Sequence, residues 1–400
     1  MKTSRIPRVV WLLGLVSLCM DLSSEMIHAL LPVFLISTLG VSTVTLGLIE
    51  GVAEGTASIV KVFSGAISDW FGRRKPLIVL GYGLAALSKP LFPLANSAGM
   101  VLLARFADRI GKGIRGAPRD ALLADATTPA TRGAAFGLRQ ALDTTGALLG
   151  PLVAIGLMGV LAGNVRAVFW VAAIPAIAAV LALVIGVEEP PRPVDARPRA
   201  ALPRWSDLST LGRPFWLVVM TGVIFTLARF SEAFLIVRAM DAGLSMNWTP
   251  LALAVMNVTY VVSAYPVGKL SDRVGRRGLL LIGLAILIGA DIVLIVATQL
   301  SVVLMGIALW GLHLGLTQGL LSALVADTAP ADLRGSAFGV FYCATGIAAV
   351  VSSVLAGVLW EQLGPQYTFG AGAIFAAIAI AAFWWQHIRN SKESHRPPGG

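Results

Sequence analysis

Twelve apolar segments of about twenty residues or more, separated by short polar links, make up most of the chain. A helix needs about 20 residues to cross the hydrocarbon of a bilayer, and inside lipid its backbone groups must be bonded within the segment. The pattern therefore predicts an all-α membrane protein. The expected spans cover residues 9–38, 45–67, 76–95, 99–121, 134–161, 166–187, 214–238, 247–268, 278–297, 301–324, 335–360 and 366–388.

Composition excludes a soluble protein. Hydrophobic residues make up 56% of the 400 residues and charged residues 13%, so a soluble surface could not be covered. The formal net charge of +10 would suggest nucleic acid in a soluble chain, but cations in a chain this apolar collect in cytoplasmic loops. We therefore expect no nucleic-acid partner. Cys19 and Cys343 lie in apolar runs without metal-site spacing and are expected to be small buried residues.

The distribution of cations predicts the topology. Lys and Arg occur at the N-terminus, in alternate links and in the C-terminal tail, whereas the links at 40–45, 96–99 and 298–301 are nearly uncharged. The positive-inside rule then places both termini in the cytoplasm of a bacterial inner membrane. Residues 188–213, rich in Pro and Arg, suit a cytoplasmic linker. We expect two domains, 1–187 and 214–400, each a bundle of six helices.

A repeated motif supports this division. The stretch Gly65-Ala-Ile-Ser-Asp69-Trp-Phe-Gly72-Arg73-Arg74-Lys75 returns 203 positions later as Gly268-Lys-Leu-Ser-Asp272-Arg-Val-Gly275-Arg276-Arg277. A second pair, Ala124-Asp125 to Gly137 and Ala326-Asp327 to Gly339, recurs at an offset of 202. Repeats at half the chain length indicate two copies of one structural unit.

The first of these motifs resembles the one that joins helices 2 and 3, and 8 and 9, in the major facilitator superfamily of membrane transporters. Its first copy departs from the usual Asp-Arg by carrying Trp70. The resemblance implies twelve helices in two pseudo-symmetric bundles that rock around a central cavity, with spans 1, 4, 7 and 10 around that cavity. It also implies a cytoplasmic gate at Asp69, Gly72, Arg73, Arg74, Asp272, Gly275, Arg276 and Arg277.

Span 1 carries Asp21, Glu25 and His28, whose i, i+4, i+7 spacing stacks them on one helical face. Ionisable groups inside spans are costly and therefore suggest a function. Two carboxylates and an imidazole can bind a divalent ion such as Fe²⁺, Ni²⁺ or Co²⁺, or they can relay protons. The structural alternative is that they pair with cations of span 4.

Spans 2 and 4 carry further charges. We expect Glu50 near the outer, solvated end of span 2, and Glu54 and Lys61 deeper, where they chiefly compensate other charges. Span 4 carries a cationic stripe, which suits an anion or a metal–anion complex, or simple pairing with Asp21 and Glu25. The stripe consists of Arg105, Asp108, Arg109 and Lys112.

The second half and span 5 add weaker candidates. Arg229 and Glu232 lie one turn apart in span 7, and His313 lies in span 10, where a lone histidine is usually a core residue. Asp291 in span 9 has no evident partner. In span 5, Gly146, Gly150 and Pro151 offer a flat face for close packing and resemble the motif of superfamily antiporters, which mostly export.

The acids and histidine from Asp21 to His28, the pair Glu50 and Glu54, and the stretch from Asp108 to Asp120 together resemble a bacterial subgroup of exporters for nickel and iron resistance. The first expectation is therefore proton-coupled efflux of a divalent metal or its complex. A multidrug exporter is the second, and a membrane sensor or scaffold without transport the third. An enzyme is not expected, because the composition excludes a soluble one, and the lack of a nucleotide-binding P-loop argues against pumping driven by ATP. The expected energy source is the proton gradient, without a cofactor. The expected partners are the lipid bilayer and a small substrate, with the chain acting as a monomer.

Overall fold

The computed structural model describes residues 7–71, 73–189, 211–274, 276–317, 320–329 and 333–394. These residues form helices and connecting turns and contain no strand. The first half of the chain has seven α-helices and one π-helical turn: α1 (Arg8–Val33), η1 (Phe34–Thr38), α2 (Thr43–Phe71), α3 (Lys75–Ser88), α4 (Leu91–Leu94), α5 (Ala98–Asp125), α6 (Pro129–Val160) and α7 (Val165–Gly186).

The second half repeats this plan with two more broken helices. Its elements are α8 (Arg213–Leu227), α9 (Ala233–Asp241), η3 (Met246–Trp248), α10 (Leu251–Val274), α11 (Arg276–Val296), α12 (Leu300–Thr317), α13 (Leu320–Thr328), α14 (Arg334–Leu363) and α15 (Pro365–Ser394). Counting α3–α4, α8–α9 and α12–α13 as single crossings, the described residues make twelve crossings, as the sequence predicts. Eight of them are long and apolar enough to be recognised as spans by length and composition alone.

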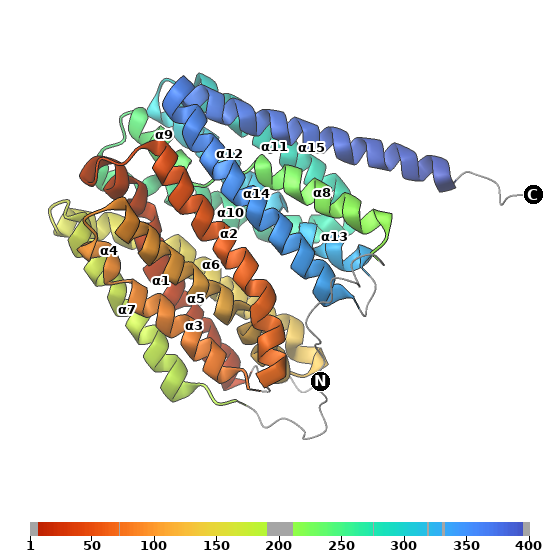
Figure 1. The fold of residues 1–400 in the computed structure, drawn as a ribbon, viewed down its shortest axis with the longest axis horizontal. Helices are drawn as coiled ribbons and strands as arrows, with labels where there is room; N and C mark the ends of the chain where they lie inside the picture. Colours follow the sequence, from red (N-terminus) through yellow and green to blue (C-terminus); the bar gives the residue numbers. More distant parts are fainter. Residues whose placement is uncertain are drawn as a thin grey trace, which may run out of the picture.

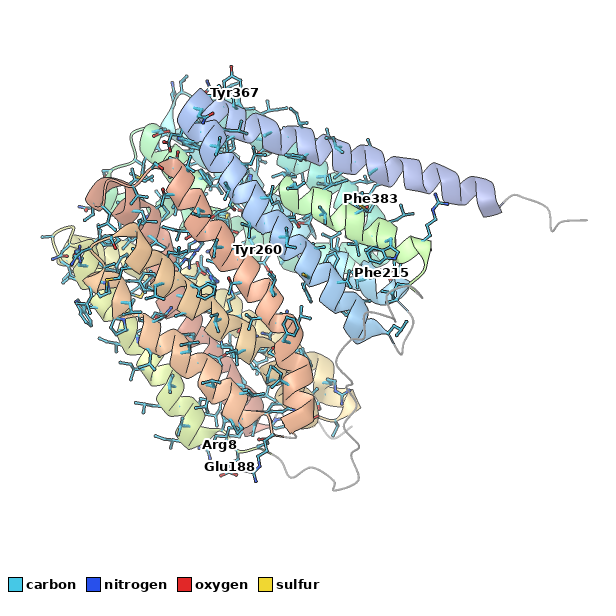
Figure 2. All side chains as sticks on the ribbon, viewed as in Figure 1. Arg8, Glu188, Phe215, Tyr260, Tyr367 and Phe383 are labelled. Atoms are coloured by element: carbon cyan, nitrogen blue, oxygen red, sulfur yellow. The ribbon has the colours of Figure 1, made fainter. Side chains whose placement is uncertain are left out.

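The two halves form separate bundles that lie side by side (Figure 1). Arg8 and Glu188 lie at the same end of the first bundle, and Tyr367 lies at the opposite end of the molecule (Figure 2). We call the end with Arg8 and Glu188 the linker side and the other end the far side. Residues 190–210, most of the predicted linker, lie outside the described residues.

Polar side chains complete several helix ends. Ser97 accepts a hydrogen bond from the Met100 amide at the start of α5, and Asn164 does the same for Ala167 at the start of α7. The Glu189 carboxylate accepts the amides of Arg74 (2.7 Å) and Lys75 (3.1 Å) at the start of α3, where the helix dipole favours a negative charge. The beginning of the linker is thereby attached to the turn between α2 and α3.

Glycines bring α2 and α14 into close contact between the bundles. A Cβ on Gly51 would lie 3.0 Å from Val350 Cα, and one on Gly55 would lie 2.9 Å from the Gly346 carbonyl oxygen. Only a glycine face allows backbones to approach this closely. A further contact between the bundles joins α6 to α10, where Asn257 Nδ2 donates to the Ala147 carbonyl oxygen at 3.0 Å.

The two bundles are fastened together on the far side. Glu361 of α14 accepts the Val44 amide (3.2 Å) and the Thr43 hydroxyl (3.4 Å) at the start of α2, and Thr43 also donates to the Gly357 carbonyl oxygen (3.2 Å). A carboxylate of one bundle therefore caps a helix N-terminus of the other. Toward the linker side the ribbons of the two bundles diverge (Figure 1). In this conformation these contacts hold the two bundles together on the far side.

Removing the charge of this contact should favour opening of the far side. Glu361→Gln keeps the shape of the side chain but weakens its attraction to the N-terminus of α2, so we expect roughly a twofold rise in the far-side-open population. Spin labels at Thr38 and Thr298, in a chain without its native cysteines, would measure this as longer distances. Asp241→Asn removes a far-side carboxylate that no contact joins to the first bundle in the described part, and it should change nothing. Equal distance distributions in the parent, Glu361→Gln and Asp241→Asn proteins would show that the Glu361 contact does not hold the far side together.

Candidate functional site

A cavity of about 540 Å³ lies between the bundles. Its volume is within the roughly 300–1,000 Å³ that is typical of small-molecule sites. The first bundle contributes mostly charged and titratable side chains: Glu25, His28, Glu50, Glu54, Arg109 and Lys112. The second bundle contributes all the aromatic side chains of the lining, Phe225, Phe230, Tyr260, Trp310 and Tyr342, together with polar ones and the charged Arg229 and Glu232. The cavity is thus chemically two-sided.

His28 stands between two carboxylates. Its Nδ1 lies 3.4 Å from Glu25 Oε2, one turn away on α1, and its Nε2 lies 3.5 Å from Glu50 Oε2 on α2. Glu25 and His28 line the cavity, as expected for span 1. An imidazole that contacts an acid at each nitrogen can take a proton from one side and release it on the other. We refer to Glu25, His28 and Glu50 as the His28 cluster.

Two arginines of α5 neutralise two acids of α2. Arg105 holds Glu50 through both of its carboxylate oxygens, at 3.1 and 2.5 Å, and each of the two residues is only 1% exposed. One turn further along both helices, Arg109 lies 3.2 Å from Glu54. The prediction that Glu50 is solvated is therefore wrong, because the α2–α5 contact buries it. Charge compensation is found for Glu54, whereas Lys61 lies over the Tyr342 ring, 5.0 Å from its centroid. These two arginines pair with span 2 and not with Asp21 and Glu25.

Asp108 does not face the cavity. Its carboxylate accepts a hydrogen bond from Lys89 Nζ at 2.8 Å, and Lys89 also donates to Ser24 at 2.9 Å. This buried group joins α1, α3 and α5 behind the cavity wall. Lys89 was not among the sequence candidates. The only signal was a single cation, followed by Pro90, within the apolar run of span 3.

Asp21 lies apart from Glu25 and His28, the other two members of the predicted metal set on α1. It faces α6, where a Cβ on Gly146 would lie 3.2 Å from Asp21 Cβ, and it does not line the cavity. One turn further along, Gly150 of α6 also lies close to Glu25, where an added Cβ would be 2.5 Å from Glu25 Cβ. Among the described residues, no group of three or more His, Cys, Asp and Glu side chains is placed to hold a metal ion. The geometry therefore gives no support to a metal site at Asp21, Glu25 and His28.

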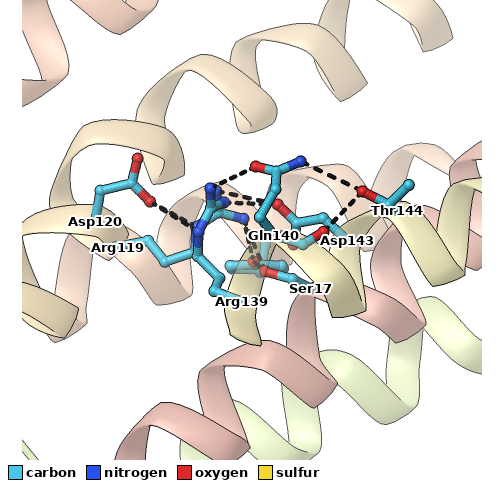
Figure 3. Close-up of polar contacts among 8 residues, drawn as sticks. Ser17, Arg119, Asp120, Arg139, Gln140, Asp143 and Thr144 are labelled. Atoms are coloured by element: carbon cyan, nitrogen blue, oxygen red, sulfur yellow. Dashed lines mark hydrogen bonds and ion pairs between the residues drawn. The ribbon is translucent and has the colours of Figure 1, made fainter. Parts of the chain in front are cut away.

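An ionic network ties α5 to three other helices of the first bundle on the linker side (Figure 3). Arg119 donates to Ser17 of α1 at 2.7 Å and approaches Tyr82 of α3 at 3.5 Å. On α6, the Asp143 carboxylate accepts a hydrogen bond from Arg139 at 2.6 Å and lies 3.8 Å from the Arg119 guanidinium. The span-5 motif, which starts at Gly146, therefore follows directly after the part of α6 that this ionic network joins to α5.

Arg229 and Glu232 both line the cavity, but no regular helix carries them. They belong to the break between α8 and α9, residues 228–232. Arg229 lies over the Phe225 ring, 5.6 Å from its centroid. Tyr260, on the second bundle, lies near the middle of the molecule, between the bundles (Figure 2). Sequence reasoning missed the aromatic wall, since scattered aromatics in apolar runs give no signal of their own.

His313 is not a cavity residue. It is fully buried, and its Nδ1 lies 2.7 Å from the Gly283 carbonyl oxygen on α11. Of the candidates in the second half, the structure therefore brings Arg229 and Glu232 to the cavity but places His313 in the core.

The predicted gate is only partly described. Arg73 is exposed, and Arg74 is buried with its Nε 2.8 Å from Asp125 at the end of α5. Gly72 and Gly275, and the side chains of Asp69, Asp272, Arg276 and Arg277, lie outside the described residues. The gating role of all these residues stays a prediction.

Comparisons with known proteins agree with this architecture. The family model described as "Major Facilitator Superfamily" matches residues 13–339 and, in a second match, 242–400. An uncharacterized transporter of the same superfamily from Methanocaldococcus jannaschii is 32% identical over 378 residues, which cover 92% of each protein. The inner membrane transport protein YajR of Escherichia coli is 26% identical and covers 93% of this chain and 81% of its own.

A shorter match and a solved structure complete the comparison. The multidrug resistance protein MdtH of Photorhabdus laumondii is 32% identical over 127 residues, 32% of this chain and 31% of its own. The crystal structure of a bacterial homologue of the human lysosomal transporter Spinster, inward-facing and unoccupied, has a TM-score of 0.74 at 16% identity and covers 98% of both chains. The family model, the full-length relatives and the fold agree, and the chain belongs to the major facilitator superfamily of membrane transporters.

Proposed function

We propose that this transporter uses the proton gradient to export a small organic molecule that has both a charged group and an aromatic or apolar part. The observation that carries this proposal is the two-sided cavity. The charged side chains of the first bundle can pair with the charged group of the substrate, and the rings of the second bundle can stack against its aromatic or apolar part. Lys112 and Glu232 enter the cavity without an ion pair in the described part of the chain and are free to meet substrate charges.

Proton coupling is assigned to the His28 cluster. Glu25, His28 and Glu50 form an unbroken line from the cavity into the buried α2–α5 contact. A proton arriving at His28 weakens the hold of Arg105 on Glu50, because both cations then compete for one carboxylate. Substrate charge in the cavity and protonation of the cluster are thus linked through short-range electrostatics.

Two observations support export and an orientation with both termini in the cytoplasm. The cations of the links obey the positive-inside rule for that orientation. The Gly146, Gly150 and Pro151 motif, whose glycines approach α1 closely at Asp21 and Glu25, resembles that of antiporters, which mostly export. In this orientation the far side, where Glu361 joins the two bundles, faces away from the cytoplasm.

Transport into everted membrane vesicles tests this function. With an imposed pH gradient, we expect accumulation of at least one member of a panel of aromatic organic cations, anions and zwitterions, and its loss when the gradient is collapsed. Fe²⁺, Co²⁺ and Ni²⁺ belong in the same panel, since metal efflux was the first expectation from sequence. Accumulation of a metal ion alone, with no organic ion transported, would refute the proposal.

A further inference from the structure

One acid of the second bundle lies directly behind the cavity wall without a charged partner. Asp291 of α11 is completely buried. Its Oδ1 accepts a hydrogen bond from the indole nitrogen of Trp310 at 3.3 Å, and Trp310 lines the cavity. Its Oδ2 is buried and has no hydrogen-bond partner among the described residues. A buried carboxylate oxygen without a donor is costly, and costlier still inside a membrane.

The unpartnered oxygen faces the break between α8 and α9. Ala228 stands just past the end of α8, where carbonyl groups no longer have helical partners. A Cβ built on Gly372 of α15 would lie 2.8 Å from Asp291 Oδ2 and 3.3 Å from the Ala228 carbonyl oxygen. The two oxygens therefore border the same small space, which is open only because residue 372 is glycine. Both are acceptors, and the pair lacks a donor.

A proton supplies that donor. As a neutral acid, Asp291 can direct an O–H into the space that it shares with the Ala228 carbonyl oxygen while still accepting from Trp310; as a carboxylate, it would turn negative charge toward the negative end of a carbonyl dipole. The described titratable groups on the elements around it include Tyr260 on α10, His313 on α12, Tyr367 on α15, and Arg229 and Glu232 in the break. In the described part of the chain, no hydrogen bond or ion pair joins any of these to Asp291.

We propose that Asp291 is a proton-binding site of the second bundle, separate from the His28 cluster, and that its proton fastens α11 to the α8–α9 break. The break carries Arg229, Phe230, Ser231 and Glu232 into the cavity, and Ser231 Oγ lies 3.5 Å from Glu50 of the first bundle. Loss of the proton releases the break, so the shape of the cavity and the contact with Glu50 follow the protonation state of Asp291. This role in the transport cycle rests on the proposed function, whereas the proton site itself does not.

Infrared difference spectroscopy on the full-length purified protein tests the site without any substrate. Asp291→Asn keeps an acceptor for Trp310 and a donor for Ala228, so it should fold. At neutral pH, the parent-minus-variant spectrum should contain the C=O band of a protonated carboxylic acid. Asp241→Asn, an exposed carboxylate of the same bundle, should show no such band. Gly372→Ala, which crowds Oδ2, should shift the band and provides a second probe.

Two results would overturn the site: an Asp291→Asn protein that retains the full acid band, or a band that sodium ions remove at constant pH, which would make this a metal-cation site. Unchanged pH-gradient-driven accumulation of an organic ion by Asp291→Asn would overturn the role in the transport cycle, because Asp291 would then be a permanently neutral structural acid. We expect that accumulation to fall about tenfold while substrate exchange without a gradient persists. If no organic ion is transported by the parent, the proposed function fails, but the infrared result still decides the proton site.

Discussion

Arg105→Met should destabilise the protein more than any other single change around the cavity. The substitution leaves the buried Glu50 without the arginine that holds both of its carboxylate oxygens, and breaking one side of a buried ion pair costs about 3–5 kcal/mol. We expect a large fall in the yield of folded protein and in the midpoint of thermal unfolding in detergent.

The double variant Arg105→Met, Glu50→Met is the matched control. Replacing both partners of a buried pair by apolar side chains is often neutral, so the double variant should recover most of the lost thermal stability. It should still fail to transport, because the His28 cluster has lost an acid. A double variant as unstable as Arg105→Met alone would show that the pair is not the source of the effect.

His28→Gln should separate proton coupling from substrate movement. Glutamine can hydrogen-bond to the neighbouring acids but cannot take up a proton near neutral pH. We expect pH-gradient-driven accumulation of the organic ion to fall about tenfold or more, while exchange of labelled for unlabelled substrate continues. The two assays on the same vesicles measure the two functions separately.

His313→Gln is the control for that experiment. His313 is buried outside the cavity, so its replacement should affect stability but leave the ratio of driven accumulation to exchange as in the parent. If both histidine variants lose driven accumulation equally, or if neither does, the His28 cluster is not the coupling site.

The fold was predictable because its signals are repeated along the chain. Apolar length identifies most of the crossings, and the offset of 203 between the copies at Asp69 and Asp272 indicates two equivalent bundles. Helical spacing also predicted that Glu25 and His28 share a face, and both do line the cavity. These predictions depend only on the geometry of single helices.

The rest depends on which helices meet, and spacing within one helix does not contain that information. Asp21 follows the same spacing as Glu25 and both lie against α6, but only Glu25 reaches the cavity between the bundles. Asp108 belongs to the stripe of α5 but pairs with Lys89 behind it. The site at Asp291 needs Trp310 of α12, Ala228 of the α8–α9 break and Gly372 of α15 at once, and no single stretch of sequence brings these residues together.

Proton flux caused by substrate is the most direct test of the central claim, that this cavity couples an organic substrate to protons through the His28 cluster. The purified protein in liposomes with an internal pH dye should change the internal pH when an organic ion identified in the vesicle panel is added outside. The change should be absent in His28→Gln and intact in His313→Gln. Substrate entry without any change in internal pH in the parent protein, or an equal change in His28→Gln, would contradict the account.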